Sequence, residues 1–265
     1  MDLEKILPAN GPSISEVKKY IEKYLEEIIV IKCGGSVLLD ENLFKQFIED
    51  ISVIYKLGLS LIVIHGGGKN IKKKLDKLNI ESKFIDGLRV TDEITIKVVE
   101  EALLELNFEI INNLKNLQTI GESVAPQNKN IIKIKPEKKE LGFVGSPKEI
   151  DSKAILKIIK EKKIPIVVPM GTSDDKKTYN INADIAAGSV AKKLSSRRLL
   201  LMTDVEGVLD KNKKLIPEIN SSIAEKMLND GDISGGMIPK INTCLDAVNN
   251  GVTGVVIVDG RKPHS

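Results

Sequence analysis

Aromatic side chains are scarce in this sequence. Only 3% of the 265 residues are Phe, Tyr or Trp, and there is no Trp at all. Proteins that read single-stranded nucleic acid stack the bases on aromatic rings. The scarcity of such rings argues against a nucleic-acid surface, so we expect no nucleic-acid partner.

Cysteines and long apolar runs are also lacking. The two cysteines, Cys33 and Cys244, lie far apart and form no C-x-x-C pair, which excludes a disulfide framework and a common type of metal site. No apolar run approaches the ~20 residues that span a bilayer. The N-terminal residues carry acidic side chains and lack the apolar core of a signal peptide. We expect a cytoplasmic protein, or a plastid stromal one if it is organelle-encoded, with no membrane partner.

The net charge is small, because 40 basic residues nearly balance 37 acidic ones and leave +3 at pH 7. The lysines are spread along predicted helices and are read as solvated faces, although a basic rim that attracts anionic substrates remains open. With 42% hydrophobic residues, the chain has the composition of a globular protein. Its length is sufficient for one large α/β unit or for two lobes.

Short β-branched runs alternate with longer amphipathic stretches along the chain. This alternation predicts an α/β fold, a three-layer αβα sandwich with a mostly parallel central sheet. Residues 121–139 are the least regular segment and are expected to form loops and a hairpin at one edge. The predicted strands are 28–33, 61–65, 131–134, 164–169, 199–203 and 254–258, and the predicted helices are 15–26, 41–55, 69–78, 92–117, 151–161, 183–193, 222–229 and 237–250.

The first candidate site follows a predicted strand that ends in Lys32, with Gly34 and Gly35 directly after it. A buried ammonium group needs an anion beside it, and glycines let backbone N–H groups approach a ligand closely. A lysine that simply reaches solvent from the strand end explains this segment equally well.

The second candidate site is His65-Gly-Gly-Gly68, where three glycines follow a strand and open a helix, a typical anion cradle. It is not a Walker A loop, because Val63 stands where that loop needs its first glycine and Asn70 replaces its Ser or Thr. We interpret His65 as a structural hydrogen-bonding residue rather than a catalytic base. Both glycine-rich strand ends would lie at the carboxyl edge of one parallel sheet, where ligands bind.

Polar side chains gather in two further segments. Arg89 lies in Gly-Leu-Arg-Val-Thr-Asp92, just before a helix that Thr91 or Asp92 would cap, and its guanidinium can grip a carboxylate. Asn180, Asn182 and Asp184 precede a small-residue helix, and Asp184 could organise lysines or a magnesium ion. The alternatives are a surface arginine and a set of helix caps.

Two segments of the C-terminal half resemble parts of a nucleotide site. A predicted buried strand ends in Thr203-Asp204, and Gly207 then turns the chain. Gly235 and Gly236 precede a helix that carries Lys240 in its first turn, for which a solvated lysine is the alternative.

Together these segments resemble the amino acid kinase family. The match runs in consistent order from Val30 to Ser265, through K-x-G-G, H-G-G-G, G-L-R-V-T, L-G-F-V-G, Y-N-I-N-A-D, T-D-V-x-G-V-L and G-G-M-x-x-K. It is most similar to members that act on N-acetyl-L-glutamate. The resemblance implies the amino acid kinase fold and, with ATP and Mg²⁺, phosphorylation of the γ-carboxylate of N-acetyl-L-glutamate to N-acetyl-L-glutamyl 5-phosphate in arginine (ornithine) biosynthesis.

The resemblance also implies a role for each matching residue. Lys32 and Lys240 would contact the transferring phosphoryl group, and Asp184 would hold the two lysines. Arg89 would bind the α-carboxylate of the substrate, with Gly67, Gly68, Asn180 and Asn182 completing its site. The residues expected at the nucleotide are Gly34, Gly35, Thr203, Asp204, Gly207, Val208, Asp210, Gly235 and Gly236. No protein side chain is assigned to a metal ion.

Three regions are expected from this resemblance: a helical extension over 1–27, an acyl-substrate lobe over 28–190 and an ATP-binding lobe over 191–265. The first helix resembles that of arginine-inhibited, hexameric members, although packing on its own domain is the alternative. We therefore expect a homo-oligomer, dimer or hexamer, with arginine as a feedback inhibitor and a PII signalling protein as a further candidate partner. Because the family usually continues past residue 260 with a helix and a strand, we expect a truncated C-terminus.

Several rival activities remain open from the sequence. Within the family they are the kinases of aminoadipate, carbamate, glutamate and UMP, and outside catalysis a dead amino-acid sensor on the same fold. The joint presence of Lys32, Asp184 and Lys240 argues against the sensor. A nicotinamide-binding protein is disfavoured because G-x-G-x-x-G is absent.

Overall fold

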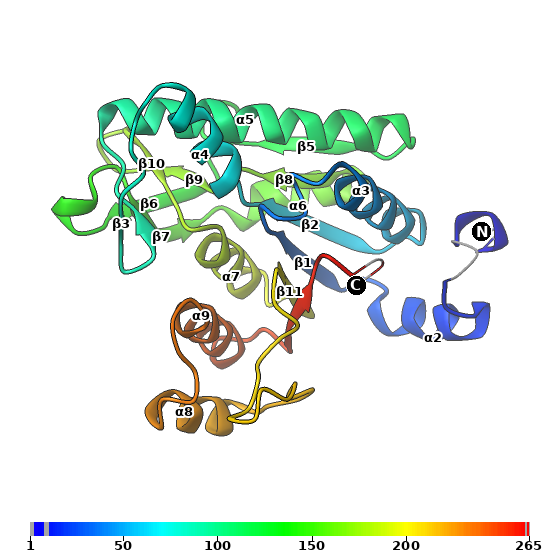
Figure 1. Ribbon diagram of the computed structural model, residues 1–265. Helices are drawn as coiled ribbons and strands as arrows, with labels where there is room; N and C mark the ends of the chain where they lie inside the picture. The colour runs from blue at the N-terminus through cyan, green and yellow to red at the C-terminus, as the bar shows by residue number, and fades with distance from the viewer. Residues whose placement is uncertain (1–2, 8–10, 263, 265) are drawn as a thin grey trace.

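The computed structural model describes residues 3–7, 11–262 and 264, so the predicted regions 1–27 and 191–265 each include positions outside the described residues (Figure 1). Its centre is a sheet of six parallel strands in the order β12-β11-β1-β2-β8-β5. Helices cover both faces, which confirms the predicted three-layer fold. The strands are β1 (Ile28–Cys33), β2 (Ser60–His65), β5 (Gly121–Val124), β8 (Ile164–Val167), β11 (Arg198–Thr203) and β12 (Val255–Asp259).

The helices lie close to where the sequence periodicity predicts them. Polar side chains begin several of them: Ser13 and Glu16 form a capping box on α2, and the Asp92 carboxylate accepts from Thr95 N at 2.7 Å at the start of α5. The helices are α1 (Leu3–Ile6), α2 (Ile14–Tyr24), α3 (Glu41–Lys56), α4 (Gly68–Lys77), α5 (Glu93–Asn116), α6 (Ser152–Lys160), α7 (Ala183–Lys193), α8 (Ser221–Asn229) and α9 (Met237–Asn249), with a 3₁₀ turn at Lys139–Leu141.

Side chains of the central strands alternate between the two helical layers. Val30 on β1 packs in the cluster that includes α6 and α7, whereas Ile31 packs in the cluster that includes α3 and α5. The same alternation directs Lys32 toward α7 and His65, at the end of β2, toward α5. Lys32, next to the last residue of β1, and His65, the last residue of β2, therefore face opposite layers.

A second, mixed sheet of four strands lies beside the central one, in the order β10-β9-β6-β7. The segment 131–134, predicted as a core strand, belongs to this sheet as β6 and pairs antiparallel with β7. The segment 121–139, where loops and a hairpin were expected, contains β6 of this antiparallel pair and also β5, a strand of the central sheet. A separate two-stranded hairpin pairs β3 with β4. These strands are β3 (Phe84–Ile85), β4 (Leu88–Arg89), β6 (Ile132–Pro136), β7 (Gly145–Ile150), β9 (Met170–Thr172) and β10 (Thr178–Asn180).

None of the helices in the described residues is both long and apolar enough to cross a membrane.

Candidate active site

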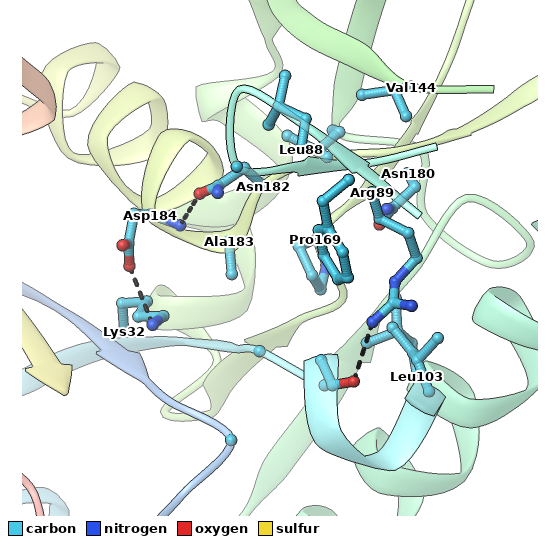
Figure 2. Close-up of a pocket in the computed structure, with 18 residues that line it drawn as sticks. Lys32, Leu88, Arg89, Leu103, Val144, Pro169, Asn180, Asn182, Ala183 and Asp184 are labelled. Carbon is cyan, nitrogen blue, oxygen red and sulfur yellow. Dashed lines mark hydrogen bonds and ion pairs between the residues drawn. The ribbon is translucent and has the colours of Figure 1, made fainter. Parts of the chain in front are cut away.

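A cavity of about 240 Å³ opens at the carboxyl ends of β1 and β2, where the two glycine-rich segments meet (Figure 2). This is the edge at which the sequence predicts an anion site. The backbone contributes Gly35 and Gly66 to Gly68. The polar side chains that line the cavity are Lys32, Arg89, Asn180, Asn182 and Asp184.

Asp184 joins two lysines from different parts of the chain. Its Oδ1 lies 3.0 Å from Lys32 Nζ, and its Oδ2 accepts a hydrogen bond of 2.7 Å from Lys240 Nζ. The three side chains are only 11–18% exposed. Asp184 sits in the first turn of α7, where the helix dipole favours a negative charge. The predicted assembly of these three residues is thus present.

The electrostatic balance of this triad favours an anion. Burial raises the pKa of Asp184, but the charges of Lys32 and Lys240 outweigh burial and hold that pKa below its ordinary value. One carboxylate against two ammonium groups leaves an excess positive charge in a poorly solvated place. Such a site attracts a phosphate or carboxylate group.

A close approach of α7 and α9 brings Lys240 within reach of Asp184. A methyl group on Gly188 of α7 would stand 2.8 Å from Thr243 Cγ2 on α9, too near for a real contact. Lys240 lies in the first turn of α9, one turn before Thr243. The absence of a side chain at Gly188 therefore helps to set the distance between the two charged residues.

One glycine of each strand end, Gly34 and Gly67, fits tightly against its neighbours. A Cβ on Gly34 would lie 3.0 Å from the carbonyl oxygen of Met202 on β11, and a Cβ on Gly67 would lie 2.5 Å from Leu103 Cδ2 on α5. Gly67 also precedes α4 as its N-cap residue, so the first N–H groups of that helix point outward from its N-terminus. Glycine is needed at these two positions because the backbone passes close to other chain segments there.

Arg89 is buried, at 7% exposure, and lines the cavity from β4. Its guanidinium donates to Ser82 Oγ at 2.6 Å and to Gly68 O at 3.1 Å, and it stacks on the Phe84 ring at 4.7 Å. In the described part of the chain, no carboxylate lies within ion-pair distance of it. The guanidinium is therefore fixed in orientation with no carboxylate in contact, although Asp76 offsets part of its charge from a greater distance, and this leaves room for a ligand carboxylate.

Asn180 and Asn182 reach the cavity from the segment between β10 and α7. Asn182 caps α7, with its Oδ1 accepting from Asp184 N at 2.9 Å and Ile185 N at 3.3 Å. This confirms that one of the three polar residues of the segment is a helix cap. Figure 2 shows Lys32 with Asp184 on one side of the cavity and Arg89 with Asn180 on the other.

Of the residues predicted at the nucleotide, Gly35 lines this cavity, whereas Gly34 and the residues of the C-terminal half do not. Thr203 ends β11, which lies beside β1, and Asp204 follows it; Gly235 and Gly236 are exposed just before α9. Val208 packs in a separate small core with α8 and α9, and Gly207 turns with φ +146°.

Asp210 accepts two hydrogen bonds of 2.8 Å within its own turn, from Asn212 N and Lys214 N. A role for these residues in nucleotide binding stays a prediction.

An apolar wall of the cavity escaped the sequence analysis. It consists of Ile71, Phe84, Leu88, Leu103, Val144, Pro169 and Ile181. Leu88 beside Arg89, Ile181 between Asn180 and Asn182, and Val144 in the L-G-F-V-G segment could have been inferred from their neighbours. The other residues come from separate elements and share no local pattern.

No three His, Cys, Asp or Glu side chains within the described ranges lie close enough together to hold a metal ion. The one carboxylate of the cavity, Asp184, is already engaged by two lysines. A metal ion at this site would therefore need other ligands, such as the phosphates of a nucleotide.

A buried carboxylate shared by two lysines, beside glycine N–H groups at the carboxyl edge of a parallel sheet, defines a kinase that lacks a Walker loop. The model of the amino acid kinase family matches residues 27–259. The chain belongs to the amino acid kinase family.

Its relatives include proteins named for one enzyme activity. The acetylglutamate kinase of Pelagibacter ubique (strain HTCC1062) is 54% identical over 264 residues, which cover 100% of this chain and 92% of that protein. The acetylglutamate kinase of Nitrobacter winogradskyi is 42% identical over 283 residues, covering 100% of this chain and 94% of that protein.

A solved structure shares the fold. The N-acetylglutamate synthase of Neisseria gonorrhoeae, complexed with coenzyme A and N-acetyl-glutamate, aligns with a TM-score of 0.86 over 96% of this chain. The identity is 21%, and this chain spans 60% of that protein's length. The likeness concerns the fold alone.

Proposed function

We propose that this chain transfers the γ-phosphoryl group of ATP to the γ-carboxylate of N-acetyl-L-glutamate, giving ADP and N-acetyl-L-glutamyl 5-phosphate in arginine biosynthesis. The observation that carries the proposal is the two-ended cavity, with the Lys32–Asp184–Lys240 triad at one end and Arg89 at the other. Such a cavity suits a small dicarboxylate, and the relatives with 54% and 42% identity are named for this activity.

The substrate would lie across the cavity with its two carboxylates at opposite ends. Arg89 is fixed by Ser82 and the Gly68 carbonyl, so its remaining N–H groups can grip the α-carboxylate. Asn180 offers amide groups to the acetamido group. The γ-carboxylate would then reach the N–H groups of Gly67 and Gly68 near Lys32.

Catalysis in this arrangement needs charge stabilisation and not a general base. The γ-carboxylate is already a nucleophile at neutral pH, so no proton has to be removed. The barrier arises from repulsion between this carboxylate and the triphosphate, and from charge on the phosphoryl oxygens in a loose, in-line transition state. Lys32 and Lys240 would offset that charge from two sides, while Asp184 keeps their ammonium groups in place.

The nucleotide would bind on the side of the sheet formed by residues 191–265. We assign its phosphates to Gly34, Gly35 and the N-terminus of α9, and the rest of the nucleotide to the loops after β11. Magnesium would enter bound to the ATP phosphates, where it supplies additional charge neutralisation. The acyl substrate would occupy the part formed by residues 28–190.

We also infer that α2 takes part in a homo-oligomer. Val17 is the buried residue of this helix. Tyr20, within the helix, is 56% exposed, and Leu25, just past the end of the helix, is 55% exposed. An exposed apolar stripe of this kind is typical of a helix that pairs with another subunit. Arginine inhibition and a PII partner would act through this region. Removal of residues 1–26 should lower the oligomer mass and the response to arginine, and unchanged values would reject both inferences.

The activity is tested by trapping the acyl phosphate product with hydroxylamine in the presence of ATP and magnesium. N-acetyl-L-glutamate should give hydroxamate, whereas glutamate and aminoadipate should give little. UMP and carbamate would be followed by ADP release. A higher kcat/KM with any of these rivals would reject the substrate assignment and leave the kinase assignment standing.

A further inference from the structure

A buried histidine and a buried asparagine form a hydrogen-bonded pair under the glycine loop. His65 is 0% exposed and Asn107, on α5, is 1% exposed. Asn107 Nδ2 lies 3.2 Å from His65 Nε2 and also donates to the carbonyl oxygen of Ile166 on β8 at 2.9 Å. On its other side, His65 Nδ1 lies 3.1 Å from the carbonyl oxygen of Gly66. The pair thus links α5 and β8 to the first peptide of the loop.

These contacts determine where the proton of the imidazole lies. The Ile166 carbonyl can only accept, so the group of Asn107 that faces it must be the NH₂ group. Its second N–H then points at His65 Nε2, which must accept. The carbonyl of Gly66 also only accepts, so the proton resides on Nδ1. Burial lowers the pKa of His65 to about 4, in keeping with this neutral form.

The same contacts fix the orientation of the loop backbone. Gly66 N donates to the Cys33 carbonyl at 2.8 Å, and its own carbonyl is held by the His65 ring. A trans peptide places its C=O and the following N–H on opposite sides. Because the carbonyl of Gly66 turns toward the buried ring, Gly67 N–H turns away from it, toward the cavity that Gly66 and Gly67 line. Among the described residues, Gly67 N–H finds no acceptor.

Helix α5 supports this peptide at two points one turn apart. Asn107 holds the His65 ring, and Leu103, four residues earlier on the same face, packs against Gly67 so closely that a Cβ there would clash at 2.5 Å. The helix therefore limits both the rotation of the peptide and its displacement.

We propose that His65 and Asn107 are positioning residues for the phosphoryl transfer, which aim Gly67 N–H at the reacting oxygens; this rests on the proposed function. The hydrogen bond from His65 Nδ1 holds the Gly66 carbonyl away from the cavity. Without it, the peptide can rotate and present a carbonyl oxygen, which repels the substrate carboxylate and the phosphoryl group. Neither side chain touches the substrate.

Two substitutions of His65 distinguish this role from simple core packing. In His65→Asn, the side-chain amide can occupy the place of Nδ1 and still donate to Gly66. In His65→Gln, the amide reaches the place of Nε2 and meets Asn107, and it fills the space better. We expect His65→Asn to keep kcat within about tenfold of wild type and His65→Gln to lose about a hundredfold, since a lost donor of this kind costs ~10²–10³ in rate.

The KM for ATP should stay unchanged in both variants, because the nucleotide is assigned to residues other than Gly66 and Gly67. If His65→Gln is as active as His65→Asn or more active, the role is packing and the proposal is overturned.

Asn107→Asp is a second variant that keeps the size of the side chain and leaves the imidazole in place. Its carboxylate accepts and cannot donate, so at pH 8 it draws the imidazole proton to Nε2 and leaves a lone pair facing the Gly66 carbonyl. We expect kcat to fall by at least about tenfold, measured well below the unfolding midpoint. A kcat within twofold of wild type would overturn the proposal even if the His65 variants fail to fold.

The matched control is Ser52→Ala. Ser52 and Thr119 form another buried polar pair in the α5-side layer, with 2.7 Å between their hydroxyl oxygens, away from the cavity. The loss of the Ser52 hydroxyl should lower the free energy of unfolding and leave kcat unchanged.

The wild type is assayed first. If it phosphorylates N-acetyl-L-glutamate and the variants match it, the positioning role fails alone. If it uses another acceptor, the substrate assignment fails and the variants are compared on that acceptor.

Discussion

The two sides of the proposed site are built differently. On the acyl side, Arg89, His65 and Asp184 are buried or nearly so, and each has hydrogen-bond or ionic partners in the protein. On the nucleotide side, Asp204 and Gly235 are exposed on loops. The acyl side is held by buried contacts, whereas on the proposed nucleotide side Gly207 and Val208 are buried and the loops with Asp204 and Gly235 are not. We expect the nucleotide to order these exposed loops when it binds. Substitutions on the two sides should therefore differ in both size and kind.

The largest effect should come from Asp184→Asn. The change leaves the ammonium groups of Lys32 and Lys240 facing each other in a buried place without their shared carboxylate. We expect kcat to fall by about 10³-fold, as for the loss of a preorganised electrostatic group, while the KM for each substrate changes little. Steady-state kinetics with the hydroxylamine assay measures this.

The control for that variant is Asp246→Asn. Asp246 pairs with Lys192 on the exposed side of the same two helices, α9 and α7. An exposed pair contributes about 0–1 kcal/mol, so activity and stability should both be nearly unchanged. Equal losses in the two variants would show that the triad acts only by joining the helices.

The next largest effect concerns the pH dependence of stability and comes from His65. Burial holds its pKa near 4 in the folded protein, below the usual 6.5. Between these values the unfolded chain binds a proton that the folded chain does not, so this group lowers the free energy of unfolding as pH falls from 6.5 to 4. The difference amounts to about 3 kcal/mol.

Denaturant unfolding of the wild type and of His65→Asn at pH 7 and pH 4.5 measures this contribution. The variant should lose less stability than the wild type over this range. Identical pH profiles of stability would mean that His65 is protonated in the folded state. The assignment of a neutral imidazole to the buried pair with Asn107 would then be wrong.

A smaller effect is expected for Arg89→Lys. The lysine keeps the charge and loses the fork that contacts Ser82, the Gly68 carbonyl and the ligand carboxylate together. We expect the KM for the acyl substrate to rise about tenfold to a hundredfold, equivalent to about 1.4–2.8 kcal/mol, with the KM for ATP unchanged. A rise in the KM for ATP instead would show that Arg89 acts on the nucleotide and not on the acyl substrate.

The smallest effect should belong to Asp204→Ala on the nucleotide side. An exposed carboxylate that hydrogen-bonds to a nucleotide contributes about 1 kcal/mol, so the KM for ATP should rise several-fold. The melting temperature and the KM for the acyl substrate should stay the same, because Asp204 has few contacts within the protein. A clear loss of stability would contradict the view that this side is organised by its ligand.

Much of this architecture could be predicted where the determinants are local. The apolar runs of β1 and β2 and the caps Ser13 and Asp92 lie within a few residues of the structure they determine, and their elements were located closely. Strand β5 was missed because Gly-Glu-Ser-Val is not an apolar run. Among the described strands, it lies at the edge of the central sheet and pairs only with β8. The backbone groups on its other side pair with no strand of this sheet, so an edge strand of this kind does not require an apolar sequence.

The residues of the candidate site also differ in whether local sequence could predict them. Lys32, Arg89 and Asp184 could be proposed because each follows a recognisable turn or strand end. Asn107 could not, since it lies inside a long helix between apolar residues and meets His65 only through the packing of α5 on the sheet. No local pattern marks a side chain whose partner lies 42 residues away.

The triad also bears on how the protein folds. Asp184 and Lys240 are 56 residues apart in the sequence. Lys32 lies on β1, and the neighbouring strand β11 is far away from β1 in the sequence. Parallel pairing between such distant segments closes large loops and is intrinsically slow. Helical content should therefore return early when the unfolded chain is diluted into buffer, and catalytic activity should appear in a later phase. Formation of the ion pairs at Asp184 would then mark the last step of folding. Its rate would be measured by assaying activity in samples withdrawn during refolding, rather than by spectroscopy.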